Sequence, residues 1–418
     1  MYTKRNFIKS LLVTAALPFS LKAKSWVDEM PEAWTVQKFD DFWMEVRSEY
    51  LLKKDYINLE NGYFSMMAKP VLDAYIRDIQ MVNTEASYYM RTIQSENKQK
   101  IKDRLAELLG CGKDELIITR NTTESLDTII SGFDWKAGDE AVMAEQDYGS
   151  MLDMFKQQGK RYGTINKKVS IPLHPKNDGE IVALYEKAIT SKTRLLMVCH
   201  MINITGHILP VKKICEMAHG KGVEVMVDGA HAVAHFDFKI SDLGCDYYGS
   251  SLHKWLGTPM GAGILYVQKD KIKNLWPIYG DAGYEDDDIR KLNHTGTHPV
   301  ATDIAIHHAI DYHQKIGIKR KEERLRFLQN YWTSKVKGIK KIYINTPEDP
   351  TRNCGIANVG IEGMKPADLA KTLLDKYKIW TVAIDSANVH GVRVTPHVYI
   401  TTEELDKFVL AIKEIANS

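Results

Sequence analysis

The sequence has no pattern typical of a metal-binding or disulfide-rich protein. Its five cysteines, at positions 111, 199, 215, 245 and 354, show neither CxxC nor metal-ligand spacing. Lysine plus arginine (56) nearly balances aspartate plus glutamate (54), so no net charge favours nucleic acid or an anionic membrane. We therefore expect no metal centre, no disulfide framework and no nucleic-acid partner. A small-molecule ligand is the expected partner.

The first two dozen residues also lack an apolar run long enough for a stable membrane span. Lys4, Arg5 and Lys9 precede a short apolar run, LLVTAALPFSL, which small residues follow. This is the layout of a secretory signal, and TKRNFIK resembles a twin-arginine export signal in which Lys4 replaces the first arginine. We predict that residues 1–24 are a signal peptide of a periplasmic or exported protein. The alternative is a disordered basic tail on a cytoplasmic one.

Length and composition indicate a large domain with a smaller one. The chain has 418 residues, of which 44% are hydrophobic and 26% charged, an ordinary globular balance. From about residue 98, helical patterns alternate with short apolar runs of strand length: ELIIT, RLLMVC, VEVMV and AGILYV. Such alternation predicts a mostly parallel sheet covered by helices on both faces. Ligands bind at the carboxyl ends of the strands in such sheets.

The C-terminal part has a different pattern. Long charged helices are expected over 301–340, followed by the strand-like runs KIYIN, GIANVGI and GVRVTP and by helices near 365–377 and 402–416. Thr401 and Glu404 have capping-box spacing at the start of the last helix. We predict a large domain over 56–300 and a small α+β domain made of 25–55 and 301–418.

The strongest chemical signal lies between residues 226 and 263. Asp228 ends the apolar run in MVDGAHA, where a buried carboxylate can meet a ligand, although a lone aspartate there is more often a cap or turn residue. Lys254 follows about two dozen residues later, in SLHKWLG, directly after Ser-x-His and before a glycine-rich turn. A buried lysine can be partly deprotonated and so attack a carbonyl.

These motifs, in this order, resemble the fold-type I pyridoxal-phosphate (PLP) enzymes of aminotransferase class V, and in particular the isopenicillin N epimerase-like branch. The resemblance runs from about residue 56 over almost the whole chain. It implies an α/β fold with a mostly parallel sheet, pyridoxal 5'-phosphate as cofactor, and Lys254 as the residue of the internal aldimine. Asp228 would face the pyridine nitrogen, and His231 would lie close to the phenolic oxygen.

The same resemblance implies a phosphate site assembled from separate segments. Thr122 and Thr123 in RNTTES start a helix, where free N–H groups favour an anion, although such residues are often only caps. NTTE is similar to the family's Asn-Ala-Thr-Glu segment. Ser251 and His253 would add donors. Thr297 in HTGTH matches a position that reaches the phosphate of a neighbouring subunit, which implies a homodimer with shared active sites.

Further positions would contact the cofactor ring and the substrate. Tyr148 would stack on the ring, and Asn203 would donate to the phenolic oxygen. Arg393 in GVRVTPHVY lies among apolar residues, where a guanidinium needs an anionic partner. The family uses this arginine for the substrate α-carboxylate. Asn61 in ENGYFSM resembles the segment that lines the substrate entrance, with Ser65 in place of glycine; an ordinary turn is the alternative.

The implied function is a PLP-dependent enzyme that acts at the Cα of an amino acid. Transamination, epimerisation and elimination of a β-substituent, as in a C–S lyase, use the same residues and remain open, with Tyr63 or Tyr148 as candidate second acid of an epimerase. Cysteine desulfurases place a nucleophilic cysteine in the loop before the carboxylate-binding arginine, and AIDSANVHG contains none, so cysteine desulfurase is kept only as a less favoured alternative. A non-catalytic protein of this fold would be expected to lose Lys254, Asp228 or Arg393, and all three are present.

Overall fold

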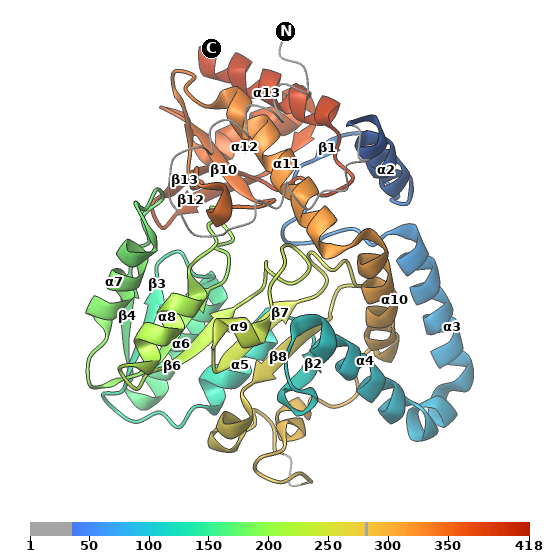
Figure 1. Ribbon diagram of the computed structural model, residues 1–418, viewed down its shortest axis with the longest axis vertical. Helices are drawn as coiled ribbons and strands as arrows, with labels where there is room; N and C mark the ends of the chain where they lie inside the picture. The colour runs from blue at the N-terminus through green and yellow to red at the C-terminus, as the bar shows by residue number, and fades with distance from the viewer. Residues whose placement is uncertain (1–35, 281–282) are drawn as a thin grey trace.

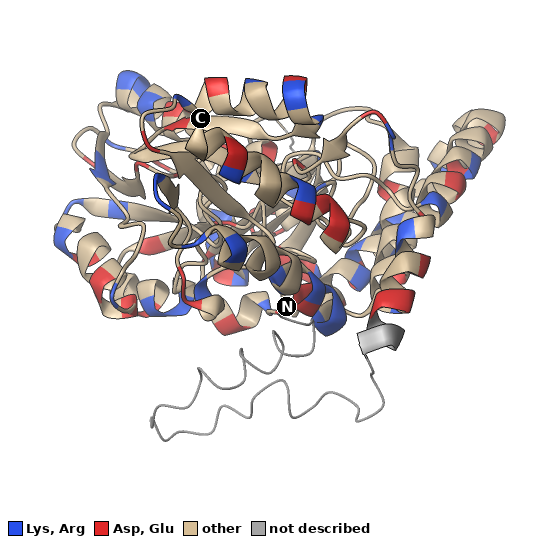
Figure 2. Ribbon diagram, turned by 90° about the horizontal axis from the view of Figure 1, so that it is seen from above, with Lys and Arg blue, Asp and Glu red and all other residues tan. Residues whose placement is uncertain are grey.

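The computed structural model describes residues 36–280 and 283–418. The predicted signal segment, residues 1–24, lies outside the described residues. Basic and acidic residues are interspersed along the ribbon in Figure 2, in keeping with the small net charge of +2. No helix in the described ranges is long and apolar enough to cross a membrane.

A seven-stranded sheet forms the centre of the large domain (Figure 1). Its strand order is β2-β8-β7-β6-β5-β3-β4, and β8 alone runs antiparallel to its neighbours β7 and β2. Four strands match the predicted apolar runs. The bounds are β2 (Leu116–Thr119), β3 (Glu140–Ala144), β4 (Ile165–Val169), β5 (Thr193–Cys199), β6 (Glu224–Asp228), β7 (Tyr247–Ser251) and β8 (Gly263–Val267).

Helices connect and cover these strands. They are α4 (Gln94–Leu109), α5 (Thr122–Gly132), α6 (Gly149–Tyr162), α7 (Asp178–Ala188), α8 (Val211–His219) and α9 (Ile240–Leu243), with short 3₁₀ turns at Lys113–Glu115, Lys269–Asn274 and Ile289–Asn293. Gly110 ends α4 in the left-handed conformation, at φ 66°, which favours glycine. A Cβ at Gly249 would lie 2.7 Å from Leu126, so this glycine in β7 allows α5 to pack close to the sheet.

A four-stranded antiparallel sheet, ordered β12-β13-β10-β9, forms the smaller unit. Thr401 and Glu404 form the predicted capping box of its last helix, which buries Leu405, Phe408, Val409 and Ile412. The elements are β9 (Ile342–Ile344), the 3₁₀ turn Pro350–Arg352, β10 (Ala357–Ile361), β12 (Val382–Ser386), β13 (Val389–Val394), α11 (Ile318–Val336), α12 (Pro366–Tyr377) and α13 (Thr402–Asn417).

Segments from the two ends of the large domain complete the structure. In α2 (Val36–Ser48), Arg47 pairs with Glu404 of α13 at 2.8 Å, and β1 (Ile57–Asn58) pairs in parallel with β11 (Ile379–Trp380). Helix α3 (Lys69–Thr92) packs along α10 (Val300–Ile316), at the side of the molecule away from β4 (Figure 1). The domain boundaries stay a prediction.

Candidate active site

Lys254 lies on the turn after β7, with only 8% of its surface exposed. Its Nζ atom lies 3.1 Å from Nε2 of His231 and 5.6 Å from the centroid of the Tyr63 ring. Burial lowers the pKa of Lys254 to about 8; the charge of Asp228 opposes this shift, and the charge of Arg393 adds to it. A sizeable fraction of neutral amine therefore exists near physiological pH, as a nucleophilic lysine requires.

Asp228 ends β6, in register with Cys199 of β5 and Gly249 of β7. Its Oδ1 accepts a hydrogen bond from the backbone N–H of Ala230 at 3.0 Å. Burial raises the pKa of Asp228, whereas the Ala230 N–H and the charge of Lys254 lower it. A buried carboxylate at the carboxyl end of a central parallel strand is well placed to meet a ligand that carries a positive charge.

The first turn of α5 meets the end of β7. The backbone N–H of Thr122 donates to Oγ of Ser251 at 2.9 Å, and the two hydroxyl oxygens lie 2.7 Å apart. Asn121 caps the helix by accepting the backbone N–H of Glu124 at 2.9 Å. Two converging hydroxyls at a helix N-terminus fit a phosphate group.

His253, two residues after Ser251, is buried and faces the ring of Phe64, with centroids 6.3 Å apart. Burial lowers the pKa of His253 to about 4, and the charge of Lys254 adds to the effect. Its Nδ1 has no hydrogen-bond partner within the described ranges. A buried imidazole with a spare nitrogen is what a bound phosphate cofactor would satisfy, so the residues present fit the predicted group.

Arg393 in β13 is fully buried and forms an ion pair with Glu60. Its Nε and Nη2 donate to the two carboxylate oxygens at 3.0 and 2.6 Å, and Nη1 donates to the backbone carbonyl of Asn203 at 3.1 Å. Glu60 Oε1 also accepts the backbone N–H groups of Gly62 and Tyr63, at 3.2 and 3.1 Å. The predicted carboxylate anchor therefore already holds a carboxylate, supplied by the chain itself.

Tyr63 connects the two halves of the site. Its ring lies 4.0 Å from the Arg393 guanidinium carbon, and its hydroxyl accepts a hydrogen bond from Nδ2 of Asn203 at 3.3 Å. The same ring lies 6.4 Å from His231 and 6.5 Å from Tyr148, centroid to centroid. Tyr148 precedes α6 and is 37% exposed.

The comparisons with known proteins agree with this arrangement. Residues 60–408 match the aminotransferase class-V family. The chain belongs to this family. It is similar to an isopenicillin N epimerase of Amycolatopsis lactamdurans, with 27% identity over 393 residues covering 90% of this chain and 98% of the relative. It is also similar to a cysteine desulfurase of Haloferax volcanii, with 26% identity over 383 residues covering 85% and 88%.

Solved structures show the same fold. An apo cysteine desulfurase of Thermococcus onnurineus superposes with a TM-score of 0.80 at 22% identity, covering 89% of this chain and 98% of the other. The cystine C–S lyase C-DES, solved with its product cysteine persulfide, gives 0.77 at 20% identity, covering 87% and 98%. The predicted class-V membership, fold-type I architecture and PLP-dependent enzyme class are therefore confirmed. The roles of individual residues stay predictions.

In this class-V enzyme, Asn61 has no hydrogen-bonding capacity left for a substrate. Its Oδ1 accepts from the Tyr399 hydroxyl at 2.6 Å and from Nδ2 of Asn58 at 3.0 Å. Its Nδ2 donates to the backbone carbonyls of Asn58 and Thr395, at 3.1 and 2.9 Å. The geometry thus favours a structural role for Asn61, which holds the segment carrying Glu60 against β13.

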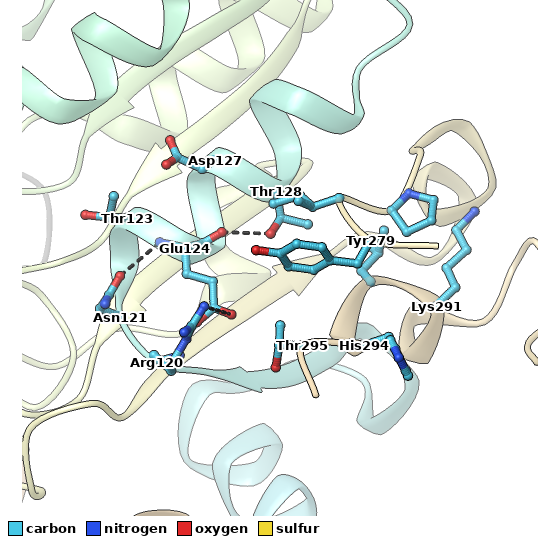
Figure 3. A pocket seen from close by; sticks show the side chains of 13 residues that line it. Arg120, Asn121, Thr123, Glu124, Asp127, Thr128, Tyr279, Lys291, His294 and Thr295 are labelled. Carbon is cyan, nitrogen blue, oxygen red and sulfur yellow. Dashed lines mark hydrogen bonds and ion pairs between the residues drawn. The ribbon is translucent and has the colours of Figure 1, made fainter. Parts of the chain in front are cut away.

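The two remaining predicted phosphate residues are Thr123 and Thr297. Thr297 is exposed on the segment between Ile289–Asn293 and α10, and its contact with a neighbouring subunit stays a prediction. Thr123 lines a cavity of about 510 Å³ between α5 and residues 277–295, where the Arg120–Glu124 ion pair and Tyr279 face each other (Figure 3). This cavity includes neither Lys254 nor Arg393. We place the site at Lys254 because the perturbed groups converge there.

The sequence left three residues of the site without a role. Glu60 lies beside Asn61, and a buried arginine does signal an anionic partner, but that partner was identified as the substrate. Trp255 directly follows Lys254 and has no exposed surface. Asp147 precedes Tyr148, and its pKa is raised to about 7, first by burial and further by the charge of Asp228. No sequence spacing links these residues to the others.

Proposed function

We propose that this enzyme acts at the Cα of an amino acid, with Lys254 as both the attachment point of the cofactor and the base at Cα. The observation that carries the proposal is a buried Lys254 that is partly neutral near physiological pH and lies next to His231, with Asp228 within electrostatic range. Pyridoxal phosphate, when bound, supplies an electron sink. Thr122, Ser251 and His253 would hold its phosphate, and Asp228 would keep its ring nitrogen protonated.

Arg393 would bind the substrate carboxylate in this proposal. Its Nε and Nη2 are occupied by Glu60 and its Nη1 donates to Asn203, so substrate has to share the guanidinium with Glu60 or displace it. The Tyr63 ring packs on the guanidinium and has to move or tilt to admit a ligand. Binding of the carboxylate would fix which bond at Cα is labile.

The burial and raised pKa of the cysteine thiols favour reactions that use no cysteine thiolate as a nucleophile. Burial raises the pKa of all five cysteine thiols, so none is poised as a nucleophile. Cys354 has no exposed surface and its pKa is raised to about 12. The turn between β12 and β13 contains Ala387 and Asn388 and no cysteine. These observations favour transamination, epimerisation or β-elimination over sulfur transfer to an enzyme cysteine.

The test is an absorbance spectrum of purified protein that has been incubated with PLP and then freed of unbound PLP, before and after addition of pools of L- and D-amino acids. We expect a visible band that changes with one pool, and in Lys254→Ala we expect the lysine aldimine to be missing and turnover of the amino acid to be lost. Chiral chromatography then separates the reactions: an inverted amino acid indicates epimerisation, a keto acid with aminated cofactor indicates transamination, and a keto acid with a released β-substituent indicates elimination. A wild type that stays colourless with PLP contradicts the proposal.

Epimerisation has one further structural requirement, a second acid opposite Lys254. The centroid of the Tyr63 ring lies 5.6 Å from the Lys254 amine and 4.0 Å from the Arg393 guanidinium, and its hydroxyl accepts a hydrogen bond from Asn203. If the reaction is epimerisation, Tyr63→Phe should slow inversion while leaving exchange of the Cα proton with solvent by Lys254. Equal loss of both would exclude Tyr63 as the second acid.

We also propose a homodimer and an exported protein. Thr297 matches a family position that contacts the neighbouring subunit's phosphate, and the N-terminal segment resembles an export signal. Sedimentation of the purified protein tests the first proposal. Mass spectrometry of the N-terminus of protein recovered from the periplasm tests the second.

A further inference from the structure

A buried tryptophan contacts the histidine that contacts Lys254. Nε1 of Trp255 lies 3.4 Å from Nδ1 of His231, and Nε2 of His231 lies 3.1 Å from Nζ of Lys254. An indole N–H can donate but not accept, so Nδ1 of His231 is the acceptor. The three side chains therefore form a directed line of hydrogen bonds that ends at the amine.

Only one combination of protonation states satisfies both contacts. If His231 carried a proton on Nδ1, alone or together with Nε2, a ring N–H would face the Trp255 N–H. If Nε2 accepted from a charged Lys254 while Nδ1 accepted from Trp255, the imidazole would be an anion. A neutral His231 with its proton on Nε2 remains, and it donates to a neutral Lys254 amine. Burial also holds the pKa of His231 well below its usual range.

Packing fixes the indole without using the side chain of His231. Its ring stacks on His235, with centroids 3.7 Å apart, and lies nearly parallel to His397 at 5.6 Å. His235 is itself fixed: its Nε2 accepts the backbone N–H of Gly355 at 2.8 Å, so its Nδ1 donates to the backbone carbonyl of His231 at 2.8 Å. The indole N–H therefore has a defined direction.

We propose that Trp255 is a positioning residue that fixes the Nε2–H tautomer of His231 and thereby favours the neutral, nucleophilic form of Lys254. This inference rests on the proposed role of Lys254 and assigns a role to a residue that touches neither cofactor nor substrate. The same tautomer presents an N–H to an anionic oxygen, as the predicted place of His231 beside the phenolic oxygen requires.

The test is covalent labelling of Lys254 in the full-length, cofactor-free protein. Formaldehyde with cyanoborohydride methylates only the neutral amine, and peptide mass spectrometry measures its rate across the pH range that spans the pKa of Lys254. Trp255→Phe keeps the stacked ring but removes the N–H, so His231 can take the Nδ1–H tautomer and accept from a charged Lys254. We expect roughly three- to tenfold slower labelling at neutral pH, the effect of one hydrogen bond, and equal rates at alkaline pH.

The other groups that act on Lys254 stay unchanged in this variant: Asp228, Arg393, Cys199 and Glu60. Trp332→Phe is the matched control, because Trp332 is equally buried and its Nε1 has no partner in the described part of the chain. It should leave the rate at Lys254 unchanged. Nitrogen-15 spectra of labelled histidines, with His231 assigned from His231→Gln, should show the Nε2–H tautomer in the wild type and its loss in Trp255→Phe.

Three results would overturn the inference: an unchanged tautomer in Trp255→Phe, slowing that persists at alkaline pH, or the same slowing when Trp255→Phe is combined with His231→Gln. The last outcome would show that Trp255 acts on Lys254 without His231. Because the labelling needs no PLP, a protein that failed to bind the cofactor would still test this inference separately from the proposed function.

Discussion

The two halves of the active site differ in how completely their polar groups are satisfied. Around Lys254, at the carboxyl ends of β6 and β7, burial shifts the pKa of the lysine, of Asp228 and of His253, and His253 keeps an unpartnered nitrogen in the described structure. Around Arg393, on β13, Glu60 accepts four hydrogen bonds, and Asn61 uses its full amide capacity.

This difference shows which half is organised to gain a ligand and which must exchange one. A buried group that lacks partners is costly until a ligand satisfies it. A buried ion pair is self-sufficient, and a new carboxylate gains only the difference between its own contacts and those of Glu60. The half around Lys254, which we call the strand-end half, should therefore govern binding of the cofactor. The half around Arg393 should govern which substrate is bound.

The largest effect should come from breaking the Arg393–Glu60 ion pair. Arg393→Leu leaves the Glu60 carboxylate buried without its cationic partner, which typically costs about 3–5 kcal/mol. We expect the free energy of unfolding in urea to fall by this amount, even in the absence of cofactor and substrate.

The matched control is Arg194→Leu. Arg194 pairs with Asp139 at 3.2 Å but is 45% exposed, so its loss should cost less than about 1 kcal/mol. A similar small cost for Arg393→Leu would mean that the Glu60 pair contributes little and that the contrast between the two halves is wrong.

Removing the buried lysine of the strand-end half should raise the free energy of unfolding, whereas removing Arg393 should lower it. A pKa of Lys254 lowered from 10.5 to about 8 corresponds to about 3 kcal/mol of destabilisation below pH 8. The unfolded chain binds the extra proton between these two values, so native stability should rise with pH across that window. Lys254→Met should therefore be more stable than wild type at neutral pH.

Denaturant unfolding as a function of pH measures this difference. It should approach zero as pH rises through 10.5, whereas Lys136→Met, at an exposed lysine, should show no difference at any pH. A Lys254→Met protein that is less stable than wild type at neutral pH would show that burying the lysine costs less than its contacts, such as that with His231, contribute.

The fold and the residues of the strand-end half could be predicted because they depend on local hydrophobic patterns and on the order of motifs, which the sequence shows directly. Asp228 ends an apolar run, and Lys254 lies about two dozen residues on, so their distance in space follows from the pairing of β6 with β7. The capping box at Thr401 and the C-cap at Gly110 depend on neighbours within a few residues. Such features need no tertiary information.

The Arg393 half could be predicted only in part because its contacts join distant segments. The sequence indicates that a buried Arg393 needs an anionic partner. That partner, Glu60, is 333 positions away in the sequence and contacts Arg393 only in the folded chain. Asn61 was expected to line the substrate entrance, and its contacts with Thr395 and Tyr399 depend on the same long-range packing. Trp255 acquires its contact with His231 only when the two loops meet.

A smaller effect is expected from a substitution in the predicted phosphate site, at Ser251. Ser251→Ala removes the acceptor of the buried Thr122 N–H, with a cost of about 1–3 kcal/mol. Because the same hydroxyl is predicted to bind the cofactor, we expect weaker retention of PLP on dialysis as well.

Ser250→Ala is the control: Ser250 is buried and donates to the Gly229 carbonyl, so its loss should lower stability without weakening retention. Equal retention in both variants would remove Ser251 from the phosphate site.

The smallest effect should be the most informative about substrate. Glu60→Gln keeps an acceptor for the N–H groups of Gly62 and Tyr63 but removes the negative charge that competes for Arg393. If substrate has to displace or share Glu60, KM for an amino acid should fall roughly three- to tenfold while kcat stays nearly constant, the pattern of a change in ground-state binding. Glu60→Asp retains the charge on a shorter side chain and should not lower KM. A rise in KM in Glu60→Gln would instead mean that Glu60 orients Arg393 for the substrate, and the two halves would then cooperate where we infer competition.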